Sequence, residues 1–346
     1  MSPSRGLRRT THSFASLLSS HKPTQIYLSL SNSPHLNLSL EHHLFQTLPA
    51  TTRTLLLYIN TPSLILGRNQ NPWLETHHPL LLRSPQIQLL RRRSGGGTVF
   101  HDEGNVNYSV TVPTGEFNRD THALLIARAL RKLGVHGAAV NKRHDIVVLP
   151  TPAAEEKVDD PPGSRKVSGS AYKLTRLRSY HHGTMLLSTN LDRVRKLLRS
   201  PSKNLIEARG VASVPSPVTN IGVDTGDFIA AAVEEFMQLY GDAGVAEVEE
   251  EEVQEIENVR KGIEELRSME WVYGQTPRFS IALLGAEVVA DKGVVREVVG
   301  VDGDGLVGRR FGGEVVERVL VRSGMGEEEA RKWAGDMVGG REWGME

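Results

Sequence analysis

The sequence predicts an α+β protein in which strands and helices are mixed along one chain. Residues 25–30 show the alternating apolar pattern of a strand, and residues 54–59 indicate a second one. Residues 37–48 and 227–240 instead place apolar side chains at helical spacing. With 346 residues, the chain can bury a sizeable core and is long enough for two domains.

The overall composition excludes several classes of function. Lys plus Arg equals Asp plus Glu at 41 each, so no strong net field attracts nucleic acid or a membrane surface. The chain has no cysteine, which excludes disulfides, thiolate catalysis and zinc–thiolate sites. No apolar run approaches the roughly 18 residues that a membrane span requires. We therefore expect no nucleic-acid or membrane partner, and any chemistry falls to Lys, His, Asp and Arg.

The N-terminal segment has the composition of an organelle-targeting peptide. The first forty residues contain no Asp or Glu, while Arg5, Arg8, Arg9 and Lys22 lie among Ser, Thr and Leu. This pattern is typical of an amphipathic transit peptide, although a merely disordered tail has a similar composition. We assign residues 1–24 to one of these two and expect a location in the mitochondrial matrix. We also expect the first thirty or so residues to be dispensable for folding.

The most informative stretch places three arginines, residues 91–93, just before three glycines, residues 95–97. Glycines let a backbone approach a ligand closely, and arginines supply fixed positive charge, so the pairing suits an anion. Strand-forming residues follow at 98–100 and 107–112, which predicts a loop between two strands. The loop is neither a Walker A loop nor a dinucleotide fingerprint. From composition alone, a hairpin turn beside a solvated basic patch is equally compatible.

Further elements follow on both sides of this loop. A strand at residues 63–66 leads into the polar segment 67–73, Gly-Arg-Asn-Gln-Asn-Pro-Trp. Residues 121–133 have helical spacing, with Gly134 as a plausible stop. On the helix predicted at residues 37–48, we expect Glu41 to be a solvated acid.

The second half of the chain contains two more polar motifs. Asp145 precedes a short apolar strand, and the Pro-rich, charged residues 150–165 predict a mobile surface insertion. Lys166 then opens a motif of small residues, and a His-His-Gly-Thr segment begins at residue 181. Strand patterns at 279–289 and 294–301 and a helix near 313–323 indicate a small α+β unit of about 70 residues, a size that is only marginally self-supporting.

Seven motifs, in order, resemble those of the lipoate–protein ligase A family, in its fungal-type mitochondrial form of ligase or lipoyltransferase. They lie at residues 67–73, 92–107, 143–145, 166–173, 181–187, 212–220 and 271–279. The resemblance implies a biotin/lipoate ligase-like large catalytic domain, with mixed sheets flanked by helices, over residues 25–275. It also implies a small C-terminal α+β domain over residues 276–346. One motif departs from the family, because Arg143-His144-Asp145 stands where the family has Arg-Asn-Asp.

The resemblance also assigns roles to single residues. The catalytic residue would be Lys166, in contact with both the lipoyl carboxylate and the adenylate phosphate. The lipoate site would contain Arg92, Gly95, Gly96, Gly97, His101, Lys166 and His182. The adenylate site would contain Gly97, Thr98, Val99, Phe100, Asp145 and Lys166, with Asp145 also placing magnesium. His181 and His182 are neighbours on a predicted strand and point to opposite faces, so they cannot hold one metal together.

The activity implied is ATP-dependent lipoylation in two steps. Lipoate and Mg-ATP would give lipoyl-AMP, and the acceptor lysine of a 2-oxoacid dehydrogenase E2 subunit or of the glycine-cleavage H protein would then attack it. The absence of cysteine argues against the octanoyl transferases of related folds, which usually use a cysteine nucleophile. A lipoyl amidotransferase that takes lipoate from a lipoylated carrier or an activated donor remains an alternative, as does a non-catalytic module that holds lipoylated domains. We expect a monomer.

Overall fold

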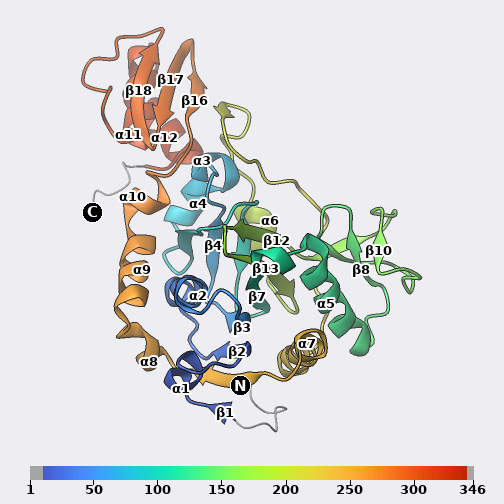
Figure 1. Cartoon of the computed structure of the whole chain (residues 1–346). Coiled ribbons are helices and arrows are strands. Elements are labelled where there is room, and N and C mark those ends of the chain that lie inside the picture. Colours follow the sequence, from blue (N-terminus) through green and yellow to red (C-terminus); the bar gives the residue numbers. More distant parts are fainter. Residues whose placement is uncertain (1–10, 341–346) are drawn as a thin grey trace. The chain divides into compact units, whose positions relative to one another are not determined.

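The computed structural model describes residues 11–340 (Figure 1). The contacts among these residues divide the chain into two compact units. Among the described residues, unit 1 comprises residues 11–63, 101–191 and 215–264. Unit 2 comprises residues 64–100, 192–214 and 265–340. In each unit, sheets and helices pack together, so the predicted α+β class is confirmed.

The large sheet of unit 1 is mixed. Its seven strands lie in the order β1 (Thr11–His12), β15 (Gly244–Val248), β2 (Thr24–Ser29), β3 (Arg53–Ile59), β7 (Asn105–Pro113), β13 (Arg178–Leu186) and β12 (Ser170–Leu174). The first four strands pair in parallel, and β3, β7, β13 and β12 pair antiparallel. The strands predicted at 25–30, 54–59 and 107–112 are therefore confirmed.

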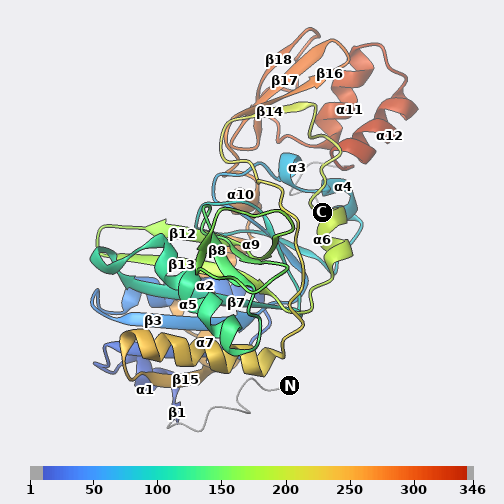
Figure 2. The same cartoon turned by 90° about the vertical axis from the view of Figure 1, so that its right-hand side faces the viewer.

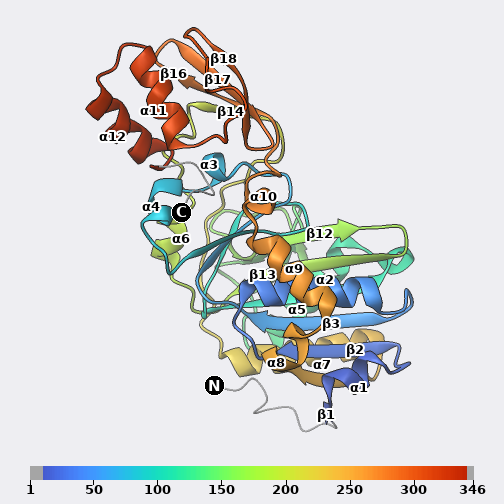
Figure 3. The ribbon, with the colours of Figure 1, turned by 90° about the vertical axis from the view of Figure 1, so that its left-hand side faces the viewer.

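Helices cover both faces of this sheet. On one face, α5 (Arg119–Lys132) and α7 (Thr225–Tyr240) lie against the sheet (Figure 2), and their apolar side chains share a core with Ile26 and Leu28 of β2. On the other face lie α1 (Phe14–Leu18), α2 (Pro34–Thr47), α8 (Glu250–Gln254) and α9 (Glu257–Arg267) (Figure 3). The apolar side chains of α1, α2 and α8 share a second core with Tyr27 of β2. The alternation of 26, 27 and 28 between the two cores follows from the pleat of the strand.

The ends of α5 show how the sequence sets the helix boundaries. The side chain of Asn118 accepts a hydrogen bond from the Asp120 amide and caps the first turn. At the other end, Gly134 has a φ of 87°, the left-handed conformation that favours glycine. The predicted stop at Gly134 is confirmed. A single turn of 3-10 helix (Thr114–Glu116) precedes α5.

A second sheet of unit 1 carries the segment before Lys166. Its strands lie in the order β10 (Lys157–Val158), β8 (Ala138–Asn141), β9 (Ile146–Val148) and β11 (Arg165–Ser168). The stretch predicted to be a mobile insertion thus contains β10, and Lys157 lies 2.6 Å from the Asp120 carboxylate. Its ordering upon ligand binding stays a prediction.

The structure differs from the expectation for the N-terminal segment. Residues 1–10 lie outside the described residues, but β1 and α1 occupy residues 11–18. Phe14 and Leu17 are buried in the core that also contains Tyr27, and β2 is an inner strand of the large sheet. Residues 13–24 are therefore part of the fold. The expectation that they are dispensable for folding rested on their charge pattern, which does not indicate that this short helix buries two apolar side chains.

Deleting residues 1–22 is expected to lower the free energy of unfolding by about 3–6 kcal/mol. The reason is the burial of Phe14 and Leu17, each of which contributes about 1.5–3 kcal/mol. Deletion of residues 1–10, which removes none of the described structure, serves as the matched control. Urea unfolding followed by circular dichroism checks this, and equal midpoints for the two deletions would contradict it.

Two small sheets lie mainly in unit 2, although Ser63 and His101, at the ends of two of their strands, belong to unit 1. One has the order β5 (Gln88–Arg91), β4 (Ser63–Leu66) and β6 (Val99–His101), and the other has the order β14 (Ile206–Ala208), β16 (Phe279–Leu283), β17 (Ala286–Asp291) and β18 (Val294–Val299). The helices are α3 (Pro72–Glu75), α4 (His78–Leu82), α6 (Leu191–Leu197), α10 (Met269–Val272), α11 (Gly313–Arg322) and α12 (Glu327–Met337). The strand predicted at residues 279–289 is a hairpin, because the chain turns at Leu284 and Gly285, both with positive φ.

Segments that are far apart in the sequence pack together in the core of unit 2. The Trp73 ring lies 5.6 Å from that of Phe279 and 4.8 Å from that of Phe311. The predicted domains, residues 25–275 and 276–346, do not coincide with the two units. Which parts fold as independent domains stays a prediction. Among residues 11–340, no helix is long and apolar enough to cross a membrane.

Candidate active site

The glycine loop, residues 94–98, connects β5 and β6 of unit 2 as predicted. Gly96 has a φ of 82°, which an L side chain rarely adopts. Gly67 packs directly beneath it, since a Cβ on Gly67 would collide with the Gly96 carbonyl oxygen. Both glycines are therefore required by the local backbone geometry.

Arg92 shapes this loop from within. The residue is 4% exposed, and its guanidinium donates hydrogen bonds to the carbonyls of Gly95 and Gly97 at 2.5 and 2.7 Å and to Ile65 at 3.0 Å. Its Nε also donates to the Ser94 hydroxyl at 2.9 Å. These bonds keep the carbonyl oxygens of Gly95 and Gly97 directed at the Arg92 guanidinium.

The three consecutive arginines do not form one basic patch. Arg91 is fully buried and donates to the carbonyls of Val272 and Gln70, and burial lowers the pKa of its guanidinium to about 9. Arg93 forms an ion pair with Glu265 and lies over the Trp271 ring. The expectation that all three supply charge to one anion is wrong, because tertiary contacts occupy Arg91 and Arg93.

The residues after the glycines have separate surroundings. The Thr98 hydroxyl donates to Gln70 Oε1 at 2.8 Å, and its amide donates to Ser213 Oγ at 3.0 Å. Val99 is partly exposed. Phe100 is buried in a cluster with Leu64 and other apolar residues, so its side chain is a core residue.

Lys166 and Asp145 are brought together in unit 1. The Lys166 Nζ atom lies 2.8 Å from Asp145 Oδ1, and the two side chains are 22% and 10% exposed. The backbone of Lys166 is fixed on both sides, because its amide donates to Pro217 at 2.8 Å and its carbonyl accepts from Thr219 at 3.1 Å. Lys166 is thus a rigidly placed, half-buried cation paired with one carboxylate.

Asp145 is suited to bind magnesium only if substrate phosphates supply further oxygen ligands. No group of three or more His, Asp or Glu side chains that could hold a metal occurs within residues 11–340. Besides Lys166, the Asp145 carboxylate faces Arg143, whose Nε lies 3.5 Å away. Since Mg²⁺ commonly binds through one or two carboxylates together with substrate phosphates, a single carboxylate suits a metal that arrives with a nucleotide.

His144, the residue that departs from the family motif, turns its ring toward α5. It has a φ of 63°, and its Nδ1 lies 2.5 Å from the Asp120 carboxylate. Burial alone would raise the pKa of Asp120, but Lys157 and His144 together hold it below its ordinary value. The backbone carbonyl of His144 accepts from Ser170 Oγ at 3.1 Å. The imidazole is therefore engaged by Asp120.

His182 is paired with Glu41, which is not the solvated acid that we expected. Glu41 is 5% exposed, and its Oε1 lies 2.8 Å from His182 Nδ1. Burial tends to raise the pKa of Glu41, but the charge of His182 and its hydrogen bond to Glu41 hold that pKa below its ordinary value. The sequence carried the signal, because Glu41 lies three residues after Leu38 and seven before Leu48, on the apolar face of its helix.

His181 faces the opposite side of the sheet, as predicted. It is fully buried, with its ring 4.9 Å from that of Tyr172 and 5.9 Å from that of His122 on α5. Burial lowers the pKa of His181 well below its ordinary value, so the ring is neutral. It is a core residue.

The predicted site residues belong to both units. His101, Asp145, Lys166 and His182 lie in unit 1, and the buried His101 Nδ1 lies 2.9 Å from Asn60 Nδ2. Arg92, the three glycines, Thr98, Val99 and Phe100 lie in unit 2. Sequence reasoning missed Glu41 and Gln70, which contact His182 and Thr98 respectively.

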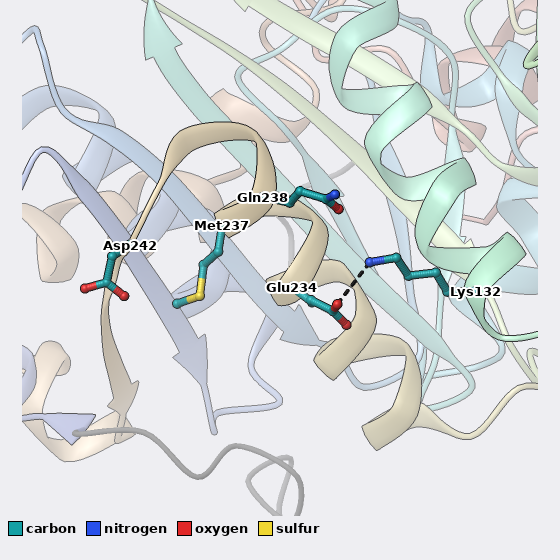
Figure 4. A pocket seen from close by; sticks show the side chains of 5 residues that line it. All are labelled: Lys132, Glu234, Met237, Gln238 and Asp242. Carbon is teal, nitrogen blue, oxygen red and sulfur yellow. Dashed lines mark hydrogen bonds and ion pairs between the residues drawn. The ribbon is translucent and has the colours of Figure 1, made fainter.

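A surface hollow of about 400 Å³ lies elsewhere, along α5 and α7 (Figure 4). Its lining residues are Lys132, Glu234, Met237, Gln238 and Asp242. The Lys132 ammonium is already paired with Glu234 at 3.1 Å and with Glu235 at 2.7 Å. None of the predicted site residues lines this hollow.

Comparison with known families identifies the class of protein. The family model described as "Lipoyl protein ligase A/B catalytic domain" matches residues 33–240. A Schizosaccharomyces pombe protein provisionally named lipoate–protein ligase A is 39% identical over 297 residues, covering 80% of this chain and 77% of its own length. The lipoate–protein ligase A of Bdellovibrio bacteriovorus is 35% identical over 264 residues, covering 74% of each chain. The chain therefore belongs to the lipoate–protein ligase family and is an enzyme of that family.

Solved structures agree in fold. P. falciparum LipL1 in complex with lipoate has a TM-score of 0.58 at 21% identity, covering 80% of this chain and 83% of that one. A Thermoplasma acidophilum bipartite lipoate protein ligase, described with its E2 lipoyl domain, has a TM-score of 0.57 at 21% identity, covering 73% and 96%. A lipoate–protein ligase A bound with ATP has a TM-score of 0.55 at 20% identity, covering 72% and 97%. At these identities, the likeness establishes the biotin/lipoate ligase-like fold alone.

Proposed function

We propose that this enzyme is an ATP-dependent lipoate–protein ligase that forms lipoyl-AMP and transfers the lipoyl group to an acceptor lysine. The observation that carries the proposal is the ammonium of Lys166, fixed 2.8 Å from Asp145 in the motif that resembles the catalytic motif of the family. Relatives solved with lipoate and with ATP support both substrates. No covalent enzyme intermediate is required.

Each residue has a definite task in this reaction. The lipoate carboxylate attacks the α-phosphorus of ATP and pyrophosphate leaves, while Lys166 neutralises the negative charge that accumulates on the phosphoryl oxygens. Asp145 orients the Lys166 ammonium, with which it is paired. The glycine loop offers backbone N–H groups to an anion without intervening Cβ atoms. In the second step, the acceptor ε-amine attacks the lipoyl carbonyl and AMP leaves.

Magnesium enters this scheme as a companion of ATP. We propose that Asp145 contributes one oxygen ligand and that the phosphates supply others, in line with the single carboxylate at this place. The bound ion would offset phosphate charge. Lys166 and Arg143, both beside Asp145, would offset charge from the protein side.

We propose lipoyl domains of 2-oxoacid dehydrogenase E2 subunits and the glycine-cleavage H protein as acceptors, and a monomeric enzyme. The Thermoplasma acidophilum relative, described together with its E2 lipoyl domain, supports the first of these. The shared requirement is an exposed lysine whose amine reaches the activated carbonyl.

An ATP–pyrophosphate exchange assay with free lipoate tests the activation step. A ligase exchanges label only when lipoate is present, because the adenylate forms reversibly. A lipoyl amidotransferase, the second candidate, would transfer lipoate from a lipoylated carrier or an activated donor and show no exchange. The observation that favours the second candidate is His144, which replaces the amide of the family motif and is engaged by Asp120. Absence of lipoate-dependent exchange would overturn the ligase proposal.

We also propose that the enzyme works in the mitochondrial matrix. The support is the acid-free, arginine-containing N-terminal sequence, even though α1 is part of the fold. A fusion of residues 1–35 to a fluorescent reporter is expected to enter mitochondria. Retention of the fusion in the cytosol would contradict the assignment.

A further inference from the structure

Gln70 joins three separate segments of unit 2. It is fully buried and follows the turn at residues 67–69. Its Oε1 atom accepts a hydrogen bond from the Gly67 amide at 2.8 Å and another from the Thr98 hydroxyl at 2.8 Å. One end of the Gln70 amide therefore ties the turn to the glycine loop.

The other end of the Gln70 amide reaches a third segment, residues 211–213. Its Nε2 donates to Ser213 Oγ at 3.0 Å and to the Val211 carbonyl at 3.3 Å. Ser213 Oγ in turn accepts from the Thr98 amide at 3.0 Å. Gln70, Thr98 and Ser213 thus form a closed ring of hydrogen bonds, called here the Gln70 ring.

The backbone around this ring has little room to move. A Cβ on Gly97 would lie 3.0 Å from Ser213 Oγ, tighter than most contacts of real side chains. A Cβ on Gly210 would collide with the Asn69 carbonyl oxygen, and Gly210 has a φ of 117°. The segments at 67–70, 94–98 and 210–213 therefore fit together in this arrangement only with glycine at the contact points.

We propose that Gln70 is a positioning residue that fixes the glycine loop and residues 211–213 as one preorganised surface. Its effect on catalysis rests on the proposed function, in which the glycine loop binds the anionic part of the substrate. The effect on the loops themselves does not depend on that function. Loops that are already ordered lose less conformational entropy upon binding, so the Gln70 ring strengthens substrate binding.

Only a carboxamide suits this position. Its oxygen accepts from Gly67 and Thr98 while its nitrogen donates to Ser213 and Val211, and a carboxylate has no donor for the second pair. Glu75 also lies here, since the Ser213 amide lies 3.3 Å from each of its carboxylate oxygens. A second buried carboxylate would therefore face an existing one.

Hydrogen exchange of the full chain tests the proposal without reference to activity. In Gln70→Ala, amides of residues 94–98 and 211–213 are expected to exchange at least about tenfold faster, while those of β16 to β18 keep wild-type rates. Gln70→Glu should accelerate residues 211–213 more than residues 94–98, because it loses only the donor. Wild-type rates in both loops, or an equal acceleration throughout unit 2, would overturn the proposal.

Asn71→Ala is the matched control. Asn71 is a neighbouring buried amide, but its side-chain oxygen caps α3 by accepting from the amides of Trp73 and Leu74. This variant is expected to lose about as much stability as other cap variants, while residues 94–98 and 211–213 exchange as in the wild type. Acceleration of both loops in Asn71→Ala, to the extent seen in Gln70→Ala, would show that Gln70 acts only through stability.

Kinetics then separate positioning from chemistry. If the wild type shows lipoate-dependent exchange of pyrophosphate, Gln70→Ala is expected to raise KM about tenfold with kcat nearly unchanged, because the loop binds substrate but does not react. A fall in kcat at constant KM would overturn the positioning role. A wild type without exchange would instead contradict the proposed function and leave the hydrogen-exchange result to decide the role of Gln70.

Discussion

Lys166→Ala is expected to lower the rate of lipoyl transfer about 100- to 1000-fold, the usual cost of losing one preorganised group that stabilises transition-state charge. Lys166 is the half-buried cation paired with Asp145, and it begins a motif of small residues that contains no substitute charge until Lys173. Mass spectrometry of an acceptor domain measures the transfer, and circular dichroism checks the fold. A folded variant that kept more than about a tenth of wild-type activity would contradict the role of Lys166.

Lys142→Ala is the matched control for this variant. Lys142 is also paired with an aspartate, Asp159 at 2.8 Å, but both side chains are more than 70% exposed. Such a pair contributes little, so activity and stability are expected to stay near wild type. Lys166→Arg should be nearly as poor as Lys166→Ala, because a planar guanidinium is larger than a compact ammonium and places its charge differently.

Local features of the fold could be predicted because they depend on neighbours in sequence. The stop of α5 at Gly134 follows from one residue with positive φ. The placement of the glycine loop between β5 and β6 follows from the residue types on either side of it. The opposite orientations of His181 and His182 follow from the pleat of β13.

Features that depend on distant contacts could not be predicted in the same way. The different surroundings of Arg91, Arg92 and Arg93 arise from Val272, Ile65 and Glu265, which are far apart in sequence. A run of three identical residues gives no indication of which partner each side chain contacts in the folded protein. The same holds for Trp73, which packs with residues about 200 positions later in the core of unit 2.

For the N-terminal segment, only the expectation that it is dispensable for folding differs from the structure. The charge pattern of a segment does not indicate whether its apolar side chains are buried. Phe14 and Leu17 lie on one side of a single helical turn, and this apolar pair was the available sign of packing. A sequence can be basic and acid-free and still supply part of a core.

His182→Ala is expected to lower the free energy of unfolding by about 3–4 kcal/mol at pH 7. The substitution leaves the buried Glu41 carboxylate without its imidazole partner, and breaking a buried pair in this way is strongly destabilising. The loss lies at the lower end of the usual range because the carboxyl can take up a proton instead of remaining charged. Urea unfolding at constant ionic strength measures it.

The pH dependence of this loss has a definite sign. In the wild type, the pKa of Glu41 is below its ordinary value, so its contribution to stability is present above the unfolded-state pKa and is lost as pH falls through the folded-state pKa. In His182→Ala, burial is no longer opposed by the imidazole and raises the pKa of Glu41. The variant is then penalised most at neutral pH, and the difference from wild type should shrink toward pH 4. A difference that grows in acid would contradict this account.

The double variant Glu41→Gln with His182→Ala identifies the cause. If the instability of His182→Ala comes from an uncompensated buried charge, replacing that carboxylate with a neutral amide of similar shape should restore most of the lost free energy at pH 7. If it comes from the cavity left by the imidazole, the double variant should be no more stable than His182→Ala. Glu41→Gln alone should cost only about 1 kcal/mol, because the amide oxygen can still accept from His182 Nδ1.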